Sequence, residues 1–196
     1  AVSGRLLVGV LGGFSLGLAS QGIQLWGAER QQAGELLAAA GVRGGVIVHA
    51  GCGDGRLTAA LHAGEGFLVH GLDADAAMVG AARKHIQSLG LYGNVSVAHW
   101  DGQRLPYIDN FVNLLVVGGQ SSVEKEEILR VLCPGGVAVF LNPKSEIENP
   151  KLVKPWPKEI DQWTHYLHGP DNNAVAMDAT VDIPRSIQWV AEPRWG

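Results

Sequence analysis

Residues 46–55 read Val-Ile-Val-His-Ala-Gly-Cys-Gly-Asp-Gly, an apolar run that ends in a tight glycine turn. A helical segment follows, and residues 71–75, Gly-Leu-Asp-Ala-Asp, then end a second apolar run in an acid. That acid, Asp73, lies 22 positions after Gly51, the spacing of a βαβ unit that binds an adenosine-containing cofactor. Glycines let the backbone approach such a ligand, and the acid accepts hydrogen bonds from ribose hydroxyls. The pattern therefore predicts a fold class and a ligand class together.

The composition of the chain limits the size of its core and the kinds of partner that are expected. The chain has 196 residues, 46% of them hydrophobic and 17% charged, so it can bury a sizeable core. A net charge of −4 gives no electrostatic reason to expect nucleic acid or an anionic membrane as partner. Of the two cysteines, Cys52 falls inside the glycine turn, and metal-type clustering is missing. Neither a metal site nor a disulfide framework is predicted.

Apolar runs and helical patterns alternate between residues 29 and 141. The helical patterns cover residues 29–40, 56–62, 75–90 and 121–132, and the expected strands cover residues 46–50, 67–72, 94–98, 111–117 and 137–141. Such alternation means parallel strands joined by right-handed crossovers. We therefore expect an α/β fold with a doubly wound, mainly parallel sheet, in which ligands bind at the carboxyl ends of the strands.

Capping signals mark two of these helices. Asp75 is placed to cap the helix that Gly90 ends. Its inward residues are expected to be Met78, Ala82, Ile86 and Leu89. Ser121 and Glu124 have capping-box form ahead of the last helix. The inward residues of that helix are expected to be Ile128, Leu129 and Leu132.

The first twenty residues differ from the rest. Arg5 precedes an apolar run of about 13 residues, which is short for a membrane span, and residues 17–19 offer a small-x-small cleavage site. We expect residues 1–20 to be a secretory signal peptide, with a buried helix or a single-pass anchor as the alternative. A cleaved leader places the protein in the periplasm or outside the cell. Otherwise the protein is cytoplasmic or anchored to a membrane.

The character of the chain changes again at Pro143. Prolines spaced along residues 143–160 predict a linker, and residues 161–196 show no clear helical period. Residues 174–177 and 186–191 are possible strands. A tail of this size cannot form its own core. Either it packs on the α/β domain, or it is the first part of an incomplete second domain, which is the interpretation we favour.

The spacing of the glycines narrows the class of ligand that the turn is expected to bind. A nicotinamide-type fingerprint needs G-x-G-x-x-G, but the third glycine, Gly55, comes one residue early. A G-x-G-x-G turn suits a ligand without a pyrophosphate, such as S-adenosylmethionine. Asp73 ends a strand, and Asp75 is the better helix cap of the two. Asp101 follows the next strand, where it can accept from an adenine amino group beside Trp100 or, alternatively, form an Asp-Gly turn.

Residues 28–142 resemble the class I S-adenosylmethionine-dependent methyltransferases. The resemblance is carried, in family order and spacing, by residues 46–55, 71–78, 100–107 and 129–136. It implies a Rossmann-like fold in which the three glycines of the turn face the methionine part of the cofactor. It also implies that Asp73 binds the ribose and that Asp101 with Gly102 binds the adenine. The predicted cofactor-binding residues are His49, Gly51, Cys52, Gly53, Gly55, Asp73, Ala74, Trp100, Asp101, Gly102 and Gly118.

Two residues depart from the family pattern. His49 stands where the family usually has an acid near the end of the first strand, and Asn113 stands where an Asp is common in the fourth. Both changes are expected to remove negative charge from beside a cationic sulfonium, which weakens binding or marks a retired enzyme. An acceptor pocket is expected beyond the fourth strand, around residues 118–122, and no catalytic residue is predicted.

The tail resembles a different family. Residues 163–173, Trp-Thr-His-Tyr-Leu-His-Gly-Pro-Asp-Asn-Asn, together with residues 187–195, look like the opening of pyrroloquinoline-quinone-like β-propeller proteins. The resemblance implies that this chain is the front part of a longer secreted protein, with the rest of the propeller as its partner. His165 and His168 are interpreted as surface or interface residues rather than metal ligands.

Three functions remain open at this point. The first is methyl transfer from S-adenosylmethionine to an unknown acceptor. The second is a catalytically retired Rossmann-like module of a secreted propeller protein, favoured by His49, by Asn113 and by a leader that removes the protein from the compartment where the cofactor is made. The third, a nicotinamide-dependent oxidoreductase, is disfavoured by the early third glycine.

Overall fold

The computed structural model describes residues 15–118, 123–141, 151–161 and 163–179. The chain divides into two compact units, residues 1–154 and residues 155–196. The predicted leader falls mostly outside the described residues, and residues 15–20 belong to the first helix. None of the helices in the described part of the chain has both the length and the apolar character needed to cross a membrane.

The first unit is built on a six-stranded sheet with the strand order β3-β2-β1-β4-β5-β6. Its strands are β1 (Gly45–Ala50), β2 (Phe67–Asp73), β3 (Val95–His99), β4 (Val112–Val117), β5 (Leu132–Phe140) and β6 (Lys151–Val153). Strands β1 to β5 pair in parallel, and β6 runs antiparallel to β5. The order reverses between β1 and β4, where doubly wound sheets bind their ligands. The predicted fold class is confirmed.

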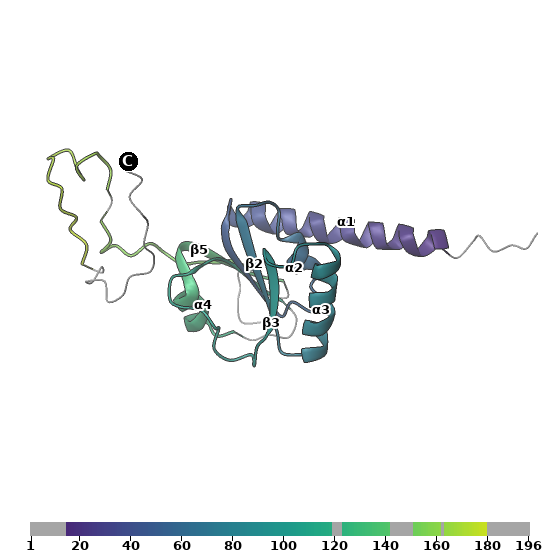
Figure 1. Cartoon of the computed structure of the whole chain (residues 1–196). Helices are drawn as coiled ribbons and strands as arrows, with labels where there is room; N and C mark the ends of the chain where they lie inside the picture. The colour runs from purple at the N-terminus through teal and green to yellow at the C-terminus, as the bar shows by residue number, and fades with distance from the viewer. Residues whose placement is uncertain (1–14, 119–122, 142–150, 162, 180–196) are drawn as a thin grey trace, which may run out of the picture. The chain divides into compact units, whose positions relative to one another are not determined.

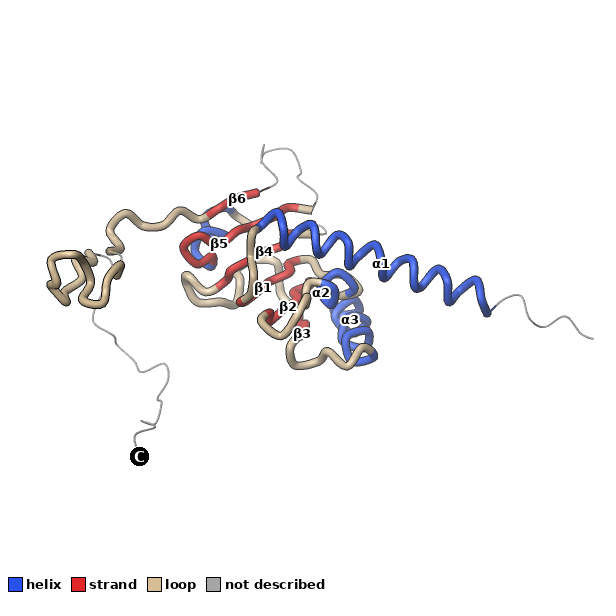
Figure 2. The backbone as a smooth tube through the Cα atoms, turned by 90° about the horizontal axis from the view of Figure 1, so that it is seen from above, coloured by secondary structure: helices blue, strands red, loops and turns tan. Residues whose placement is uncertain are grey.

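Helices cover both faces of this sheet. They are α1 (Ser15–Ala40), α2 (Arg56–Ala60), α3 (Ala76–Ser88) and α4 (Lys125–Val131). Figure 1 shows α2 and α3 on one side of the sheet and α4 on the other. The view from above shows α1 passing along the side of α2 and α3 (Figure 2). The unit therefore has three layers, with the sheet in the middle.

Two apolar layers join the sheet to these helices, because alternate residues of a buried parallel strand face opposite sides. The layer under α1, α2 and α3 includes Leu37, Ile47, Val69, Ile86 and Leu114. The layer under α4 includes Val48, Leu72, Leu115, Ile128 and Leu132. In β1 and β4, the residues that face one side of the sheet and those that face the other are therefore both largely apolar. This explains why these strands show no alternation of polar and apolar residues in the sequence.

Helix α3 starts as predicted, and two of its four expected inward residues, Ala82 and Ile86, are buried. The side chain of Asp75 accepts a hydrogen bond from the Ala77 backbone, which confirms the expected cap. Met78 and Leu89, expected to face inward, are 43% and 38% exposed. Val79 is buried instead, with Ala82 and Ile86. Consecutive residues of a helix differ by 100° in direction. Met78, one residue before the buried Val79, therefore points toward solvent.

Strand β5 starts earlier than the sequence pattern indicates. Leu132, expected on the inner face of the last helix, is the first residue of β5. The pairing with β4 shifts between Val112 and Leu114, so residues 133–136 form a bulge. A Cβ at Gly136 would lie 2.8 Å from the Cys133 carbonyl oxygen and 2.9 Å from that of Val112. This glycine lets the bulge close.

Strand β6 lies within the segment that was expected to be a linker, residues 143–160. Its residues pair with Val137 to Val139 of β5, and the backbone of Lys154 continues the contact to Gly136. The ammonium of Lys151 donates to the Ala39 carbonyl oxygen near the end of α1. Residues 151–154 therefore belong to the sheet unit, and the boundary between the units follows them.

The second unit contains no helix or strand within residues 155–161 and 163–179. Residues 174–177, a possible strand in the sequence, form no strand, and the described residues of this unit contain no strand that could pair with them. The strand expected over residues 186–191 lies outside the described residues. Asp161 holds part of the unit together, since its Oδ2 accepts from His168 Nε2 at 2.6 Å and from the Met177 backbone at 2.8 Å. In the described residues, no group of three or more His, Cys, Asp or Glu side chains is placed to hold a metal ion.

Candidate functional site

The glycine turn connects β1 to α2, and its three glycines serve different purposes. Gly51, Gly53 and Gly55 have φ angles of 75°, 54° and 79°, a region that disfavours side chains. A Cβ on Gly53 would meet nothing within 4 Å, so open space lies in front of it. A Cβ on Gly55 would lie 2.7 Å from the Cβ of Ala82 in α3. The turn therefore offers room for a ligand at Gly53 and close helix packing at Gly55.

Asp73, at the end of β2, is joined to this turn. Its Oδ2 accepts a hydrogen bond from the Gly53 backbone at 2.7 Å, and its Oδ1 accepts one from the Asp75 backbone at 2.9 Å. The side chain is partly exposed. Each carboxylate oxygen carries a further lone pair, so both remain able to accept from a ligand. The carboxylate predicted to bind ribose is thus held beside the open side of the glycine turn.

His49 lies at the carboxyl end of β1 and is 3% exposed. Its Nδ1 is hydrogen-bonded to the Thr58 hydroxyl of α2 at 2.9 Å, whereas its Nε2 has no partner among the described residues. Burial lowers the pKa of the imidazole to about 4, although the negative charge of Asp73 opposes the shift. The ring is therefore neutral at pH 7. A Cβ on Gly118, just beyond β4, would lie 3.1 Å from Nε2.

This pKa shift predicts a pH dependence of stability. The unfolded chain protonates His49 near 6.5 and the folded chain near 4, so the free energy of unfolding should decrease as the pH falls through this window. For a fully buried group the loss is on the order of 3 kcal/mol by pH 4. Urea unfolding curves at pH 7, 5.5 and 4.5 measure it.

The matched variant is His49→Leu, which removes the titrating group and should flatten the slope. Burial also lowers the pKa of His70 and contributes in the same direction, so part of the slope should persist in the variant. A slope that His49→Leu leaves unchanged would mean that His49 is not buried as a neutral ring.

Cys52 and Ala74 take supporting positions at the site. The thiol of Cys52 is buried, and burial together with the charge of Asp73 raises its pKa to about 12, so it stays protonated. A Cβ on Gly71 would lie 3.0 Å from its Sγ, which shows that the thiol packs over β2. The Ala74 carbonyl oxygen accepts from His99 Nε2 at 3.0 Å, a bond that joins the ends of β2 and β3. The packing of the Cys52 side chain and the carbonyl group of Ala74 thus help to fix the backbone of the site.

The segment after β3 carries the predicted adenine contacts. Asp101 is exposed, and its Oδ1 accepts from the Gln103 backbone at 3.0 Å in a turn that Gly102 allows with a φ of 85°. Trp100 is 5% exposed, and its Nε1 donates to the Arg104 carbonyl oxygen at 2.8 Å. The ring belongs to the core layer under α4 rather than to an open wall. Asp101 and Gly102 face solvent beside it.

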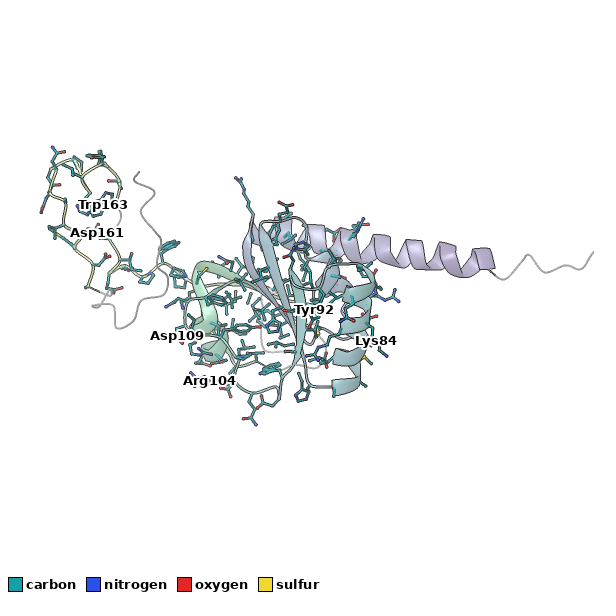
Figure 3. The ribbon with its side chains drawn as sticks, in the orientation of Figure 1. Lys84, Tyr92, Arg104, Asp109, Asp161 and Trp163 are labelled. Atoms are coloured by element: carbon teal, nitrogen blue, oxygen red, sulfur yellow. The ribbon has the colours of Figure 1, made fainter. Side chains whose placement is uncertain are left out.

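A cavity of about 530 Å³ lies between this segment and α4, with Arg104 on the α4 side of the fold (Figure 3). Its lining residues are Gly102, Gln103, Arg104, Glu124 and Glu127. The acceptor pocket was expected around residues 118–122, of which 119–122 lie outside the described residues. Gly118 donates its N–H to the Ala50 carbonyl oxygen at 2.8 Å, at the carboxyl ends of β1 and β4.

Arg130 of α4 holds residues 105–109, in the segment between β3 and β4, in place. Its guanidinium pairs with Glu127 and with Asp109, both at 2.7 Å, and donates to the carbonyl oxygens of Leu105 and Tyr107. Hydrogen bonding from Arg130 lowers the pKa of Glu127, which also accepts from the Leu105 backbone. The sequence pattern did not predict this network. Its only local signal is the three-residue spacing of Glu127 and Arg130 on one helix.

Asn113 does not lie at the cofactor site, which corrects the expectation that it replaces a charge beside a sulfonium. It is the second residue of β4, and its Oδ1 accepts from the Val46 backbone of β1 at 2.9 Å. Gly118 lies five residues farther along, about 16 Å away by the rise of a strand. Asn113 therefore joins the amino ends of β1 and β4, and its lack of charge carries no argument against cofactor binding.

Asn113→Ala should lower the free energy of unfolding by about 1–2 kcal/mol, because it leaves the partly buried Val46 N–H without a partner. Cofactor affinity should stay within about twofold, since the residue lies at the opposite end of the sheet. Thermal denaturation and calorimetric titration measure the two effects. Asn113→Asp keeps the accepting oxygen and is the control. A clear gain in cofactor affinity in that control would restore the original interpretation.

Comparison with known proteins agrees with this geometry. Residues 47–136, which run from β1 into the β5 bulge, match the family of methyltransferase domains. This part of the chain is similar to methyltransferase domains. The ubiquinone/menaquinone biosynthesis C-methyltransferase UbiE of Yersinia pestis bv. Antiqua is 33% identical over 126 residues, which are 61% of this chain and 46% of that protein. The chain thus spans about half the length of the curated relatives it matches.

Solved structures are similar in fold to the sheet unit. A candidate S-adenosyl-L-methionine-dependent methyltransferase of Methanococcus maripaludis has a TM-score of 0.53 and 26% identity, over 57% of this chain and 54% of that one. A geranyl diphosphate methyltransferase in complex with S-adenosyl-L-methionine has a TM-score of 0.50 and 25% identity, over 57% of this chain and 48% of that one. Both similarities cover a little over half of this chain.

Proposed function

We propose that the methyltransferase domain binds S-adenosylmethionine and transfers its methyl group to an acceptor. The observation that carries the proposal is the position of Asp73. Its carboxylate is held by two backbone N–H groups at the carboxyl end of β2, next to the unfilled space at Gly53. A ligand with two neighbouring hydroxyls, such as a ribose, suits the lone pairs that remain.

The residues of the domain would then hold the adenosine part of the cofactor. Asp73 accepts from the ribose, and Asp101 with Gly102 lies on the side of β3 predicted for the adenine. The bound sulfonium supplies a methyl carbon that the acceptor's nucleophilic atom attacks, while the carbon–sulfur bond breaks and the electrons stay on sulfur. Because this displacement needs alignment more than covalent help from the protein, positioning carries most of the rate. A proton that the acceptor loses passes to solvent or to a base on the acceptor side.

Calorimetric titration separates the open functions. With the purified chain, S-adenosylmethionine should give a dissociation constant in the micromolar range, and NAD should give no heat at the same concentrations. Heat with NAD and none with S-adenosylmethionine would overturn the proposal in favour of an oxidoreductase. Silence with both ligands, from a chain that is folded by circular dichroism, would favour a retired Rossmann-like module.

The retired module stays the second candidate because of one observation. The imidazole of His49 is neutral, so the site lacks the acidic charge usual at this position. Asn113 no longer supports this candidate, since it lies at the other end of the sheet. The carboxylate of Asp73 supports the enzyme, because a module without a ligand has no use for its free lone pairs.

We further propose that residues 1–20 act as a signal peptide or membrane anchor and that residues 161–196 open a β-propeller, which places the mature protein outside the cytoplasm. The apolar run behind Arg5 supports the first part. Large exposed apolar side chains support the second, since a continuing domain would cover them: Trp156, Trp163, Tyr166 and Met177 are 64%, 57%, 93% and 79% exposed. A reporter fused after residue 40 that is active only outside the cytoplasm tests the location, and an inactive fusion would contradict it.

A further inference from the structure

The cavity between the segment that follows β3 and the start of α4 has polar walls. Its volume is about 530 Å³, and its lining consists of a guanidinium, two carboxylates, an amide and a glycine, from Gly102, Gln103, Arg104, Glu124 and Glu127. Among the described residues, no aliphatic or aromatic side chain lines it. Such walls suit a charged ligand, because an apolar one would displace water from these groups without replacing its hydrogen bonds.

The guanidinium of Arg104 is free to bind a ligand, although the backbone around it is fixed. The Arg104 carbonyl oxygen accepts from the indole of Trp100 at 2.8 Å. The next residue, Leu105, donates its N–H to Glu127 Oε1 at 2.7 Å. The guanidinium itself forms no ion pair or hydrogen bond with a described residue. Hydrogen bonding from Arg130 lowers the pKa of Glu127, and the charge of Arg104 adds to this shift, so Arg104 acts on the cavity.

The two carboxylates of the cavity differ in their partners. Both oxygens of Glu127 accept from Arg130, at 2.7 and 2.8 Å, so this charge is matched within the protein. Glu124 precedes α4, and its carbonyl oxygen accepts from the Ile128 backbone at 3.0 Å. Its side chain makes no capping hydrogen bond and forms no ion pair with a described residue. The cavity therefore presents one cation, Arg104, and one anion, Glu124, that do not pair with each other.

We propose that this cavity binds a small molecule that carries both a carboxylate and an amino group, and that this molecule is the methyl acceptor. Arg104 would donate to its carboxylate, and Glu124 would accept from its amino group. The acceptor role rests on the proposed function. Gly102 supports that role, since it lines the cavity and is also a predicted adenine contact, so a ligand in the cavity would lie beside the cofactor.

The proposed reaction is methylation of the amino nitrogen. An acceptor bound as an ammonium ion first loses one proton, which passes by way of the exposed Glu124 carboxylate to solvent. The nitrogen lone pair then attacks the methyl carbon of the sulfonium. A nitrogen–carbon bond forms, the carbon–sulfur bond breaks, and its electron pair stays on sulfur. The products are a methylated ammonium ion and an uncharged thioether.

A matched set of small molecules tests the binding site. Glycine, β-alanine and 4-aminobutyrate carry both groups at increasing separations, whereas butyrate carries only the carboxylate and butylamine only the amine. Ligand-observed NMR titrations of the purified chain give the dissociation constants. The best of the three zwitterions should bind about fivefold more tightly than butyrate or butylamine, because it alone pairs with both charged walls. Equal binding of all five molecules would overturn the inference.

Two substitutions locate the binding site within the chain. Arg104→Gln should reduce the affinity of the best zwitterion about fivefold, to that of butylamine, and Glu124→Gln should reduce it to that of butyrate. Lys84→Gln in α3 and Glu126→Gln in α4 are the controls, since they make the same charge changes at exposed residues outside the cavity. Both controls should stay within about twofold of wild type. Equal losses in the controls would show a general effect of charge and overturn the inference.

Methyl transfer tests the acceptor role separately. With S-adenosylmethionine labelled in its methyl group, the zwitterion that binds best should gain the label. Arg104→Gln and Glu124→Gln should raise its KM about fivefold, with the affinity for S-adenosylmethionine within about twofold of wild type. A chain that binds both ligands but transfers no label would overturn the acceptor role. A folded chain that binds the zwitterion but not S-adenosylmethionine would overturn the proposed function while leaving the binding site in place.

Discussion

Replacing Asp73 by Ala is expected to weaken the binding of S-adenosylmethionine by about 10- to 150-fold, the range for losing hydrogen bonds to a charged group. The carboxylate is held at the end of β2 by the Gly53 and Asp75 backbones, and its remaining lone pairs are the acceptors proposed for the ribose hydroxyls. Adenosine should lose affinity by a similar factor, because it carries the same sugar. Isothermal titration at pH 7 with both ligands measures the effect.

Asp75→Ala is the matched control for this substitution. Asp75 lies two residues farther on and caps α3 through Ala77, so its loss should cost about 1 kcal/mol of stability without changing cofactor affinity. Asp73→Asn keeps the side-chain shape and an oxygen that can accept from Gly53, which separates the effect of charge from that of packing. An affinity within about twofold of wild type in Asp73→Ala would show that the carboxylate does not bind the sugar.

Gly55→Val should lower the free energy of unfolding by about 3 kcal/mol. The residue has a φ of 79°, a conformation that costs other residues about 1–2 kcal/mol, and its new Cβ would lie 2.7 Å from that of Ala82. Forcing atoms into a packed contact adds about 1–3 kcal/mol. Because the clash involves α3 rather than open space, the main effect should be on folding. Urea denaturation followed by circular dichroism measures it.

Gly64→Val is the control, since Gly64 is exposed and a Cβ there would meet nothing within 4 Å. Its free energy of unfolding should change by less than about 0.5 kcal/mol. A second comparison combines Gly55→Ala with Ala82→Gly, which removes the opposing methyl group. The double variant should be more stable than the sum of the single effects predicts. Strict additivity would mean that the two residues do not touch and that the glycine is needed for another reason.

The sequence predicted those features of the site that depend on residues close together along the chain. The glycine turn, the cap at Asp75 and the acid at the end of β2 all depend on residues a few positions apart, and the structure contains each of them. The doubly wound sheet followed from the alternation of strands and helices, because parallel strands need crossovers. The joining of Asp73 to Gly53 follows from that topology, which brings two strand ends together.

What the sequence did not reveal depends on contacts between distant segments. The bulge in β5 arises from its pairing with β4, and Asn113 bonds the backbone of β1 across 67 positions. Trp100 was predicted as a ligand wall because it precedes Asp101, but its indole packs into the core beneath α4. Nothing in the sequence distinguishes Thr58 from other threonines on short helices. Its role depends on the contact with His49, which only the structure shows.

The most direct test of the account is a crystal structure of the chain with S-adenosylhomocysteine, the product of methyl transfer. If Asp73 binds the sugar, both ribose hydroxyls will lie within about 2.5–3.0 Å of its carboxylate oxygens. The amino-acid end is expected to point toward His49 and Gly118. A ligand bound elsewhere, or bound here with its sugar away from Asp73, would contradict the account.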